Sequence, residues 1–397
     1  MNHRHLSRPL FSMHVDTALS WRGGQNQVWL TVQNLRTNGH RAMLIANPKG
    51  ELYRRASNEG DLYPLPFRFE IDLLAAWRLA RLLRFHRPHV LHAHDAHAAA
   101  VSSIALSLSL TKNVRFIVSR RVDFRLGQTF LSRWKYHRVE KFICASDAIR
   151  QILITDGMQT AKTTVVHEGI NIDHIASTKP LDLHREFSIP PDTPIVGNVA
   201  ALVSHKGQRY LLDAIALVIR KIPDAHFLIV GTGHLETALM EQIQRLNLRH
   251  RVTLTGFRPD VISLLKGLDL FVMSSVMEGL GTSVLDAMAC GCPVIGTYAG
   301  GIPESIVNEK TGLLVPVRDA DALATAILRL LRDRSLRLKF GRAGLARAKS
   351  HFSSIRMAHE TTGVYETLVD RVHARDTAYP DADVQNHISP TSRDDKE

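Results

Sequence analysis

Three consecutive segments in the second half of the chain alternate between strand-like and helix-like patterns. Leu270–Ser275 is a short apolar run that ends in small polar residues, and Pro293–Thr297 is a second short apolar run. Between them, Thr282–Cys290 has the residue spacing of a helix with one apolar face. A strand, a helix and a strand joined by short turns predict a parallel β-sheet covered by helices.

The turn that leads into this predicted helix combines a carboxylate with two glycines, in the order Glu278, Gly279, Leu280, Gly281. Glycine lets backbone N–H groups come close to a ligand, and the N-terminus of a helix attracts phosphate. A carboxylate repels phosphate and instead accepts hydrogen bonds from hydroxyl groups. A turn that offers both kinds of group is suited to a phosphorylated sugar.

The same alternation runs along most of the chain, in two series separated by a proline-containing stretch at Asp173–Pro194. The expected strands are Leu10–Val15, Ala42–Ala46, Val90–His94, Arg115–Ser119, Lys141–Ala145 and Thr163–His167 in the first series, and Ile195–Leu202, Ala225–Val230, Val252–Thr255, Leu270–Ser275 and Pro293–Thr297 in the second. Expected helices include Gln27–Asn38, Ile71–Phe85, one capped by Asp147, Ala322–Leu331 capped by Asp319, and a last helix from Ser353 to about Val372. The pattern predicts an α/β protein with two doubly wound domains facing a cleft, where ligands bind beyond the carboxyl ends of the strands.

Length and composition agree with this architecture. The 397 residues are enough for two domains with full cores. The longest apolar runs are of strand length, well short of the roughly 18 residues of a membrane span. The basic N-terminus has no apolar segment of the secretory type, and only three cysteines are present, so we expect a cytoplasmic protein. We interpret Cys290 and Cys292 as structural residues.

The positive charge is concentrated in the first part of the chain. Residues 1–179 contain 25 Lys and Arg against 13 Asp and Glu, so the whole net charge of +12 comes from them. Aromatic residues are few and no nucleic-acid motif is present, which argues against nucleic acid as the partner. The asymmetry favours an anionic membrane surface or an anionic lipid-linked acceptor, with dispersed solvated charge as the alternative.

The longest motif carries a family resemblance. The segment EGLGTSVLDAMACGCPVIGTYAGGIPE, residues 278–304, resembles the donor-site signature of the retaining glycosyltransferases of family four, within glycosyl transferases group 1. Weaker resemblance extends from about Gly23 to about Leu368. It implies the GT-B fold, with an acceptor-side domain at 1–178, a nucleotide-sugar domain at 179–352, a crossover helix at 353–375 and a tail at 376–397 that we expect to be disordered.

The resemblance also implies roles for single residues. Glu278 would accept hydrogen bonds from the donor sugar, and Asp286, where the family usually has Glu, would hold the ribose. Lys206 would grip the diphosphate. Backbone groups of the donor site would come from Gly279, Leu280, Gly281 and Thr282, and from the glycine pair Gly23 and Gly24 in the first domain, where Gln25 and Asn26 are acceptor candidates. The positions of other residues after predicted strands, and not the resemblance, make Gly231 and Gly233 suited to close approach to a nucleotide and make His94 and Asp95 further acceptor candidates.

Two positions depart from the family pattern. Ala201 stands where an arginine that binds the diphosphate is usual, and Arg121 stands where a histidine near the donor sugar is usual. Arginine cannot act as a base at neutral pH. Our hypothesis is that Arg121 binds the diphosphate and replaces the cation lost at Ala201.

A metal site is the alternative interpretation of His92, His94 and His97. No carboxylate or cysteine completes a recognisable ligand set, and the resembled family needs no metal. We therefore expect core or cleft-lining histidines, no metal and no cofactor beyond the nucleoside-diphosphate sugar as co-substrate.

The sequence thus favours a retaining glycosyltransferase that moves a sugar to a glycan or lipid-linked acceptor in envelope polysaccharide or lipopolysaccharide synthesis. It would be cytoplasmic or peripheral on the inner face of the membrane. Because of Ala201 and Arg121, a catalytically silent nucleotide-sugar-binding scaffold is the main alternative. Another GT-B enzyme, such as a sugar-nucleotide epimerase or a phosphorylase, is a further one.

Overall fold

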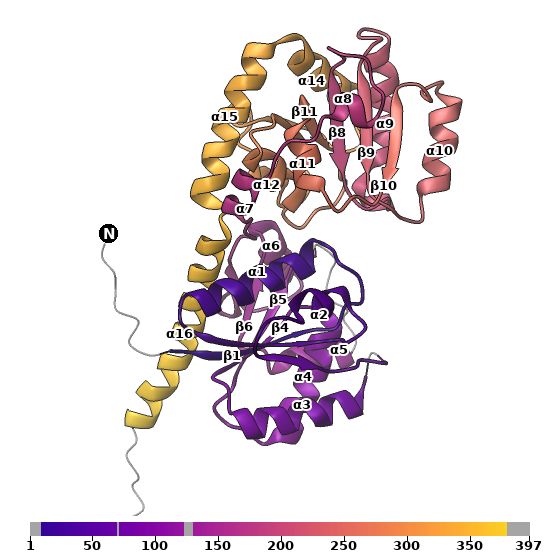
Figure 1. The fold of residues 1–397 in the computed structure, drawn as a ribbon. Coiled ribbons are helices and arrows are strands. Elements are labelled where there is room, and N and C mark those ends of the chain that lie inside the picture. Colours follow the sequence, from indigo (N-terminus) through magenta and orange to yellow (C-terminus); the bar gives the residue numbers. More distant parts are fainter. Residues whose placement is uncertain (1–8, 70, 123–129, 379–397) are drawn as a thin grey trace, which may run out of the picture.

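The computed structural model describes residues 9–69, 71–122 and 130–378. Within them the chain forms two parallel sheets, one in each half, with helices on both faces of each (Figure 1). The strand orders are β3-β2-β1-β4-β5-β6-β7 and β10-β9-β8-β11-β12-β13. The predicted fold class, two doubly wound α/β domains, is confirmed.

The elements of the first half are β1 (Phe11–Asp16), α1 (Gly23–Thr37), β2 (Arg41–Ala46), α2 (Glu51–Ala56), β3 (Leu62–Pro64), α3 (Leu73–His86), β4 (Val90–Ala93), α4 (Ala96–Ser109), β5 (Arg115–Arg120), α5 (Phe130–His137), β6 (Lys141–Cys144), α6 (Asp147–Thr155), the 3₁₀ turn η1 (Thr160–Lys162) and β7 (Thr163–Val165).

The elements that follow are α7 (Ile172–Ser177), α8 (Leu183–Glu186), β8 (Ile195–Val199), the 3₁₀ turn η2 (Ser204–Lys206), α9 (Gln208–Ile219), β9 (His226–Val230), α10 (Glu236–Arg245), β10 (Val252–Gly256), α11 (Val261–Lys266), β11 (Leu270–Met273), α12 (Thr282–Ala289), β12 (Val294–Thr297), α13 (Ile302–Ser305), β13 (Leu313–Val315), α14 (Ala320–Arg332), α15 (Arg334–His351) and α16 (Ser354–Ala378).

Alternate residues of each strand enter separate cores on the two faces of the sheet. In β2, Met43 and Ile45 pack with α3 and α4, whereas Leu44 packs on the other face with α1 and α16. Successive side chains of a strand point to opposite faces, so a strand covered on both sides is apolar throughout. This explains the short unbroken apolar runs of the sequence.

The last helix returns to the first half. Figure 1 shows α15 beside the second sheet and α16 continuing along the first. Tyr365 of α16 is fully buried there, in a cluster with Val28 and Leu44. Where the chain crosses between the halves, Ile170 N donates to the Phe352 carbonyl and Ser354 N donates to the Ile170 carbonyl, both at 2.8 Å. The crossover helix that the resemblance implied is therefore present.

The proline-containing stretch at 173–194 contains most of α7 and all of α8, because Asn171 and Asp182 cap these helices with their side chains in spite of the nearby prolines. Two local expectations were wrong. The N-cap before α6 is Ser146 rather than Asp147, since the Ser146 hydroxyl accepts from Ile149 N. Helix α16 continues to Ala378, so residues 376–378, expected in the tail, are helical.

The Asp319 cap of α14 is confirmed by its hydrogen bond from Ala322 N. Among the described residues, no helix has the length and apolar character needed to cross a bilayer.

Candidate functional site

The predicted glycine turn lies at the carboxyl end of β11 and leads directly into α12. Gly281, the residue before this helix, has φ +86°, which favours glycine. The Glu278 carboxylate accepts hydrogen bonds from Lys206 Nζ at 2.6 Å and from Ser275 Oγ at 3.0 Å, both at Oε2. Oε1 makes no hydrogen bond to another described residue, so it is available to a ligand.

Lys206 reaches Glu278 because its loop lies directly against the end of β11. Gly207 has φ +67°, and a Cβ there would overlap the carbonyl oxygen of Ser274. The Ser274 hydroxyl in turn donates to the Lys206 carbonyl at 3.0 Å. The structure therefore brings together the acid and the cation that the sequence assigned to the donor sugar and its diphosphate.

A second glycine turn, at Gly300 and Gly301, packs against the backbone of the first. Gly300 has φ +48°, and a Cβ on it would overlap the carbonyl oxygen of Glu278; a Cβ on Gly301 would overlap that of Gly279. Gly301 N donates to the Glu278 carbonyl at 3.2 Å. The backbone of Glu278 is thus held by close packing that only glycine permits.

The other predicted donor residues of the second half differ in burial and in their contacts. The Leu280 side chain is buried in the core, so only its backbone can face a ligand. Burial raises the pKa of Asp286 to about 7, and its carboxylate makes no hydrogen bond to another described residue. A Cβ on Gly231 or Gly233 would overlap the carbonyl oxygen of Ala200 or Leu202. Backbone packing therefore accounts for these two glycines, and their contact with a nucleotide stays a prediction.

Arg121 enters the site from the first half, just after β5. Its Nε lies 3.3 Å from Glu168 Oε1, and both terminal nitrogens lie 3.3 Å from His94 Nδ1. A Cβ on Gly279 would overlap the Arg121 carbonyl oxygen, so the turn of β11 touches the first half here.

Sequence reasoning missed Glu168, which is buried beside Arg121. Burial raises the pKa of Glu168 to about 7. The positive charges of Arg121 and Lys206 act to lower this pKa, and the negative charge of Glu278 acts to raise it. Two acids and two cations, one of each from either half, are therefore within electrostatic reach of one another. The signal available was an acid directly after the predicted strand Thr163–His167, at the sheet edge where sites form.

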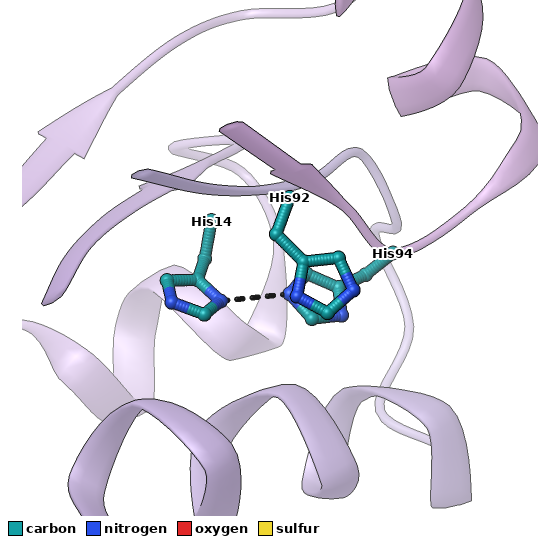
Figure 2. A group of neighbouring side chains, drawn as sticks. All are labelled: His14, His92 and His94. Atoms are coloured by element: carbon teal, nitrogen blue, oxygen red, sulfur yellow. Dashed lines mark hydrogen bonds between the residues drawn. The ribbon is translucent and has the colours of Figure 1, made fainter. Parts of the chain in front are cut away.

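Three buried imidazoles, those of His14, His92 and His94, lie together (Figure 2), and the ring of His94 contacts Arg121. Their nearest ring nitrogens are within 4.8 Å of one another. Arginine only donates, so His94 Nδ1 accepts from it and His94 Nε2–H donates to His14 Nδ1 at 2.9 Å. His14 Nε2–H then donates to Ser12 Oγ at 2.9 Å.

The third imidazole joins the same cluster through separate partners. His92 Nδ1 lies 2.6 Å from the Tyr365 hydroxyl of α16, and its Nε2 lies 2.8 Å from Ser119 Oγ. Burial lowers the pKa of all three imidazoles, that of His14 to about 3. They form a neutral hydrogen-bonded network.

A metal would have to displace this network and sit next to a guanidinium. The predicted trio for the metal alternative also differs from the observed one. His14 takes the third place, because it lies opposite His92 in the pairing of β1 with β4. His97 lies away from the cluster, with its ring 5.8 Å from that of Phe67.

The acceptor candidates lie at the carboxyl ends of β1 and β4. Gln25 Nε2 donates to Asp16 Oδ2 at 3.3 Å, while the Asn26 side chain makes no hydrogen bond to a described residue. Asp95 caps α4 and accepts from the backbone and hydroxyl of Thr17. Burial, then the charge of Asp95, raises the pKa of Asp16 to about 6. Asp16 is a further polar group at this edge that the sequence did not single out.

The glycine pair that begins α1 lies close to the start of α12. A Cβ on Gly23 would lie 3.0 Å from Thr282 Oγ1, whereas one on Gly24 would meet nothing within 4 Å. Gly23 of the first half therefore lies against Thr282 of the second, and its contact with a donor stays a prediction.

A further contact between the halves is made at the start of α6. The Ser146 hydroxyl donates to the Gly279 carbonyl at 2.7 Å. The Glu304 carboxylate accepts from the backbone N–H groups of Asp147 and Ala148 and from His167 Nε2. Although burial acts to raise the pKa of Glu304, these hydrogen bonds lower it overall. Glu304 thus holds the N-terminus of a helix from the other half.

Two family descriptions match consecutive parts of the chain. Residues 21–174 match Glycosyltransferase Family 4, and residues 181–347 match Glycosyl transferases group 1. The first range contains most of the first sheet and the second contains all of the second sheet.

Individual proteins are similar over most of their length. The capsular polysaccharide biosynthesis glycosyltransferase CapM of Staphylococcus aureus is 24% identical to this chain, and the aligned region covers 82% of this chain and 90% of CapM. The UDP-Gal:alpha-D-GlcNAc-diphosphoundecaprenol alpha-1,3-galactosyltransferase of Escherichia coli is 25% identical, covering 67% and 72%. The crystal structure of Anabaena Alr3699/HepE with UDP and glucose has a TM-score of 0.79 at 20% identity, covering 90% of this chain and 100% of that one.

Proposed function

Because the chain belongs to the glycosyltransferases of group 1 and family 4, with the GT-B fold, we propose that it transfers a sugar from a nucleoside-diphosphate donor with retention of configuration. The acceptor is a hydroxyl group of a glycan or a lipid-linked glycan. The observation that carries this proposal is the Lys206–Glu278 pair at the start of α12, opposite Arg121.

Each group of the pair has a separate task when the donor is bound. Lys206 leaves Glu278 for the diphosphate, whose negative charge grows as the sugar departs. Glu278 then accepts hydrogen bonds from the sugar hydroxyls, and Asp286 from the ribose. In the retaining reaction the departing phosphate helps to take the proton of the acceptor, so the protein needs no separate base. Orientation and exclusion of water between the two halves supply the rest.

The setting of the reaction follows from the chain's charge and its relatives. One relative is named for a diphosphoundecaprenol acceptor and another for capsular polysaccharide. We therefore assign this chain to envelope polysaccharide or lipopolysaccharide synthesis, on the inner face of the cytoplasmic membrane. We propose that Lys206 and Arg121, rather than a metal ion, meet the charge of the diphosphate.

A panel of uridine, guanosine and adenosine diphosphate sugars tests the proposed reaction. With the correct donor we expect slow release of nucleoside diphosphate, accelerated by a lipid-linked acceptor, and a product whose anomeric configuration, read by proton NMR, equals that of the donor. An inverted product would contradict retention. Donor binding without release, even with acceptors, would favour a silent scaffold, which the missing cation at Ala201 also favours.

Arg121 is expected to bind the diphosphate of the donor. Arg121→Ala should lower kcat/KM about 10- to 100-fold, because a charge-assisted hydrogen bond to phosphate contributes about 1.5–3 kcal/mol. The measurement is donor affinity by calorimetry together with turnover. Arg115→Ala is the matched control, since Arg115 lies at the other end of β5 and pairs with Glu140.

Removing Arg121 alone also leaves Glu168 buried without its cation, which destabilises the fold. The double variant Arg121→Ala/Glu168→Gln separates the two effects. We expect its melting temperature to recover while donor affinity stays low. Unchanged donor affinity and turnover in Arg121→Ala would show that this residue does not replace the cation missing at Ala201.

A further inference from the structure

Helix α3 presents an apolar face to solvent. Leu73 and Trp77 are 65% and 48% exposed, and the segment just before the helix adds exposed Phe69 and Ile71. The opposite face of the helix packs against α4 in the first core. Figure 1 shows α3 on the outside of the first half, away from the second sheet. Large apolar side chains gathered on one exposed face mark a surface that another body covers.

Arginines border this apolar face. Residues 65–93 contain five arginines against two acids, Glu70 and Asp72, and α3 itself contains no acid. Asp72 is buried as the N-cap of α3. The exposed arginines are Arg68, Arg78, Arg81, Arg84 and Arg87. Arg81 lies over the Trp77 ring, with its guanidinium carbon 5.0 Å from the centroid. Tryptophan and arginine side by side are typical of helices at a lipid–water boundary.

The apolar face begins at the edge of the sheet that carries the acceptor candidates. Helix α3 connects β3 to the parallel strand β4, so its N-terminus lies at the carboxyl ends of the strands. Phe67, just upstream, contacts the His97 ring in the first turn of α4, two residues beyond Asp95. A body that covers Phe69 and Ile71–Trp77 therefore adjoins the place where the acceptor is expected.

We propose that the surface formed by Arg68, Phe69, Ile71, Leu73, Leu74, Trp77, Arg78 and Arg81 docks on an anionic lipid bilayer, with the apolar side chains entering the headgroup boundary. The basic border complements anionic headgroups. A second copy of the chain fits poorly, because a two-fold contact would bring two arginine-bordered faces together, and α3 contains no acid to pair with them. The inference rests on the proposed function, since docking here would deliver a lipid-linked acceptor to the site.

The test is cosedimentation of the full chain with phosphatidylcholine vesicles, with and without phosphatidylglycerol. We expect binding only to the anionic vesicles, falling as salt is raised. Leu73→Ser/Trp77→Ser should weaken binding about tenfold or more, because two apolar side chains no longer leave water. Arg78→Gln/Arg81→Gln should weaken it about fivefold per charge. Met240→Ser/Leu338→Ser, at exposed apolar residues of the second half, is the control and should bind as wild type.

Equal binding by wild type and both surface variants, or no binding at low salt, would overturn the proposal. The proposal would also be overturned if the wild type bound no vesicle and formed dimers in light scattering while Leu73→Ser/Trp77→Ser remained monomeric, because this face would then bind a second copy of the chain. Donor hydrolysis without vesicles should be the same in wild type and surface variants, which also shows that the variants fold. Vesicle binding without any release of nucleoside diphosphate would contradict the proposed reaction but would still support the docking surface.

Discussion

Glu278→Gln should lower sugar transfer by about two to three orders of magnitude, the size expected when one preorganised polar contact to the reacting group is removed. The carboxylate is 11% exposed and paired with Lys206, so glutamine fits the same space but has no charge. Lys206 then has no acid to hold it and is free to bind phosphate. We therefore expect kcat to fall while affinity for nucleoside diphosphate is kept or increases.

The readouts for Glu278→Gln are turnover with the identified donor and nucleoside-diphosphate binding by calorimetry. Glu309→Gln is the matched control, because Glu309 is an exposed glutamate of the same half that pairs with Arg329. It should keep wild-type values for both. Wild-type turnover in Glu278→Gln would show that this residue has no role in the reaction. Loss of nucleotide binding together with turnover would indicate that the substitution disrupts the whole turn.

Gly300→Ala is expected to destabilise the second half by about 4 kcal/mol or more, a loss that single substitutions seldom cause. The added methyl group would overlap the carbonyl oxygen of Glu278, so backbone must move on one side or the other. The positive φ of Gly300 adds about 1–2 kcal/mol. Because the displaced residue is Glu278, turnover should fall with stability.

The control for Gly300→Ala separates crowding from backbone conformation. Gly291 has φ +74°, and a Cβ there would meet nothing within 4 Å, so Gly291→Ala should cost only about 1–2 kcal/mol. Urea unfolding followed by circular dichroism measures both variants. Equal losses would mean that the second glycine turn does not hold Glu278 in place.

Local patterns predicted what lies close together along the chain. The strand, glycine turn and helix around Glu278 are contiguous in the sequence, and Lys206 follows the strand β8 that pairs with β11. Both residues therefore reach the same sheet edge, as the alternation of strands and helices implied. The apolar periodicity likewise placed α3 and α12 within a few residues of their observed bounds.

Groups that meet only through tertiary pairing were not predictable. His14 joins His92 through the register of β1 against β4, and Glu168, which follows the edge strand β7, meets Arg121, which follows β5. Tyr365 reaches His92 from 273 positions away. The pattern of α3 showed leucines and arginines around the helix, but only its packing on α4 shows which of them face solvent.

The path of α16 has a consequence for the order in which the protein is made. One face of the first sheet is closed by Met357, Tyr365 and Leu368, which pack against Val28 and Leu44. Ribosomes deliver the N-terminal part of a chain first, and domains normally fold as they emerge. Here one face of the earliest strands is covered by α1 but not by α16 until the whole second half has been translated. A nascent chain of this protein is therefore a natural client for chaperones, and a stop codon between the halves leaves a first half that cannot complete its core.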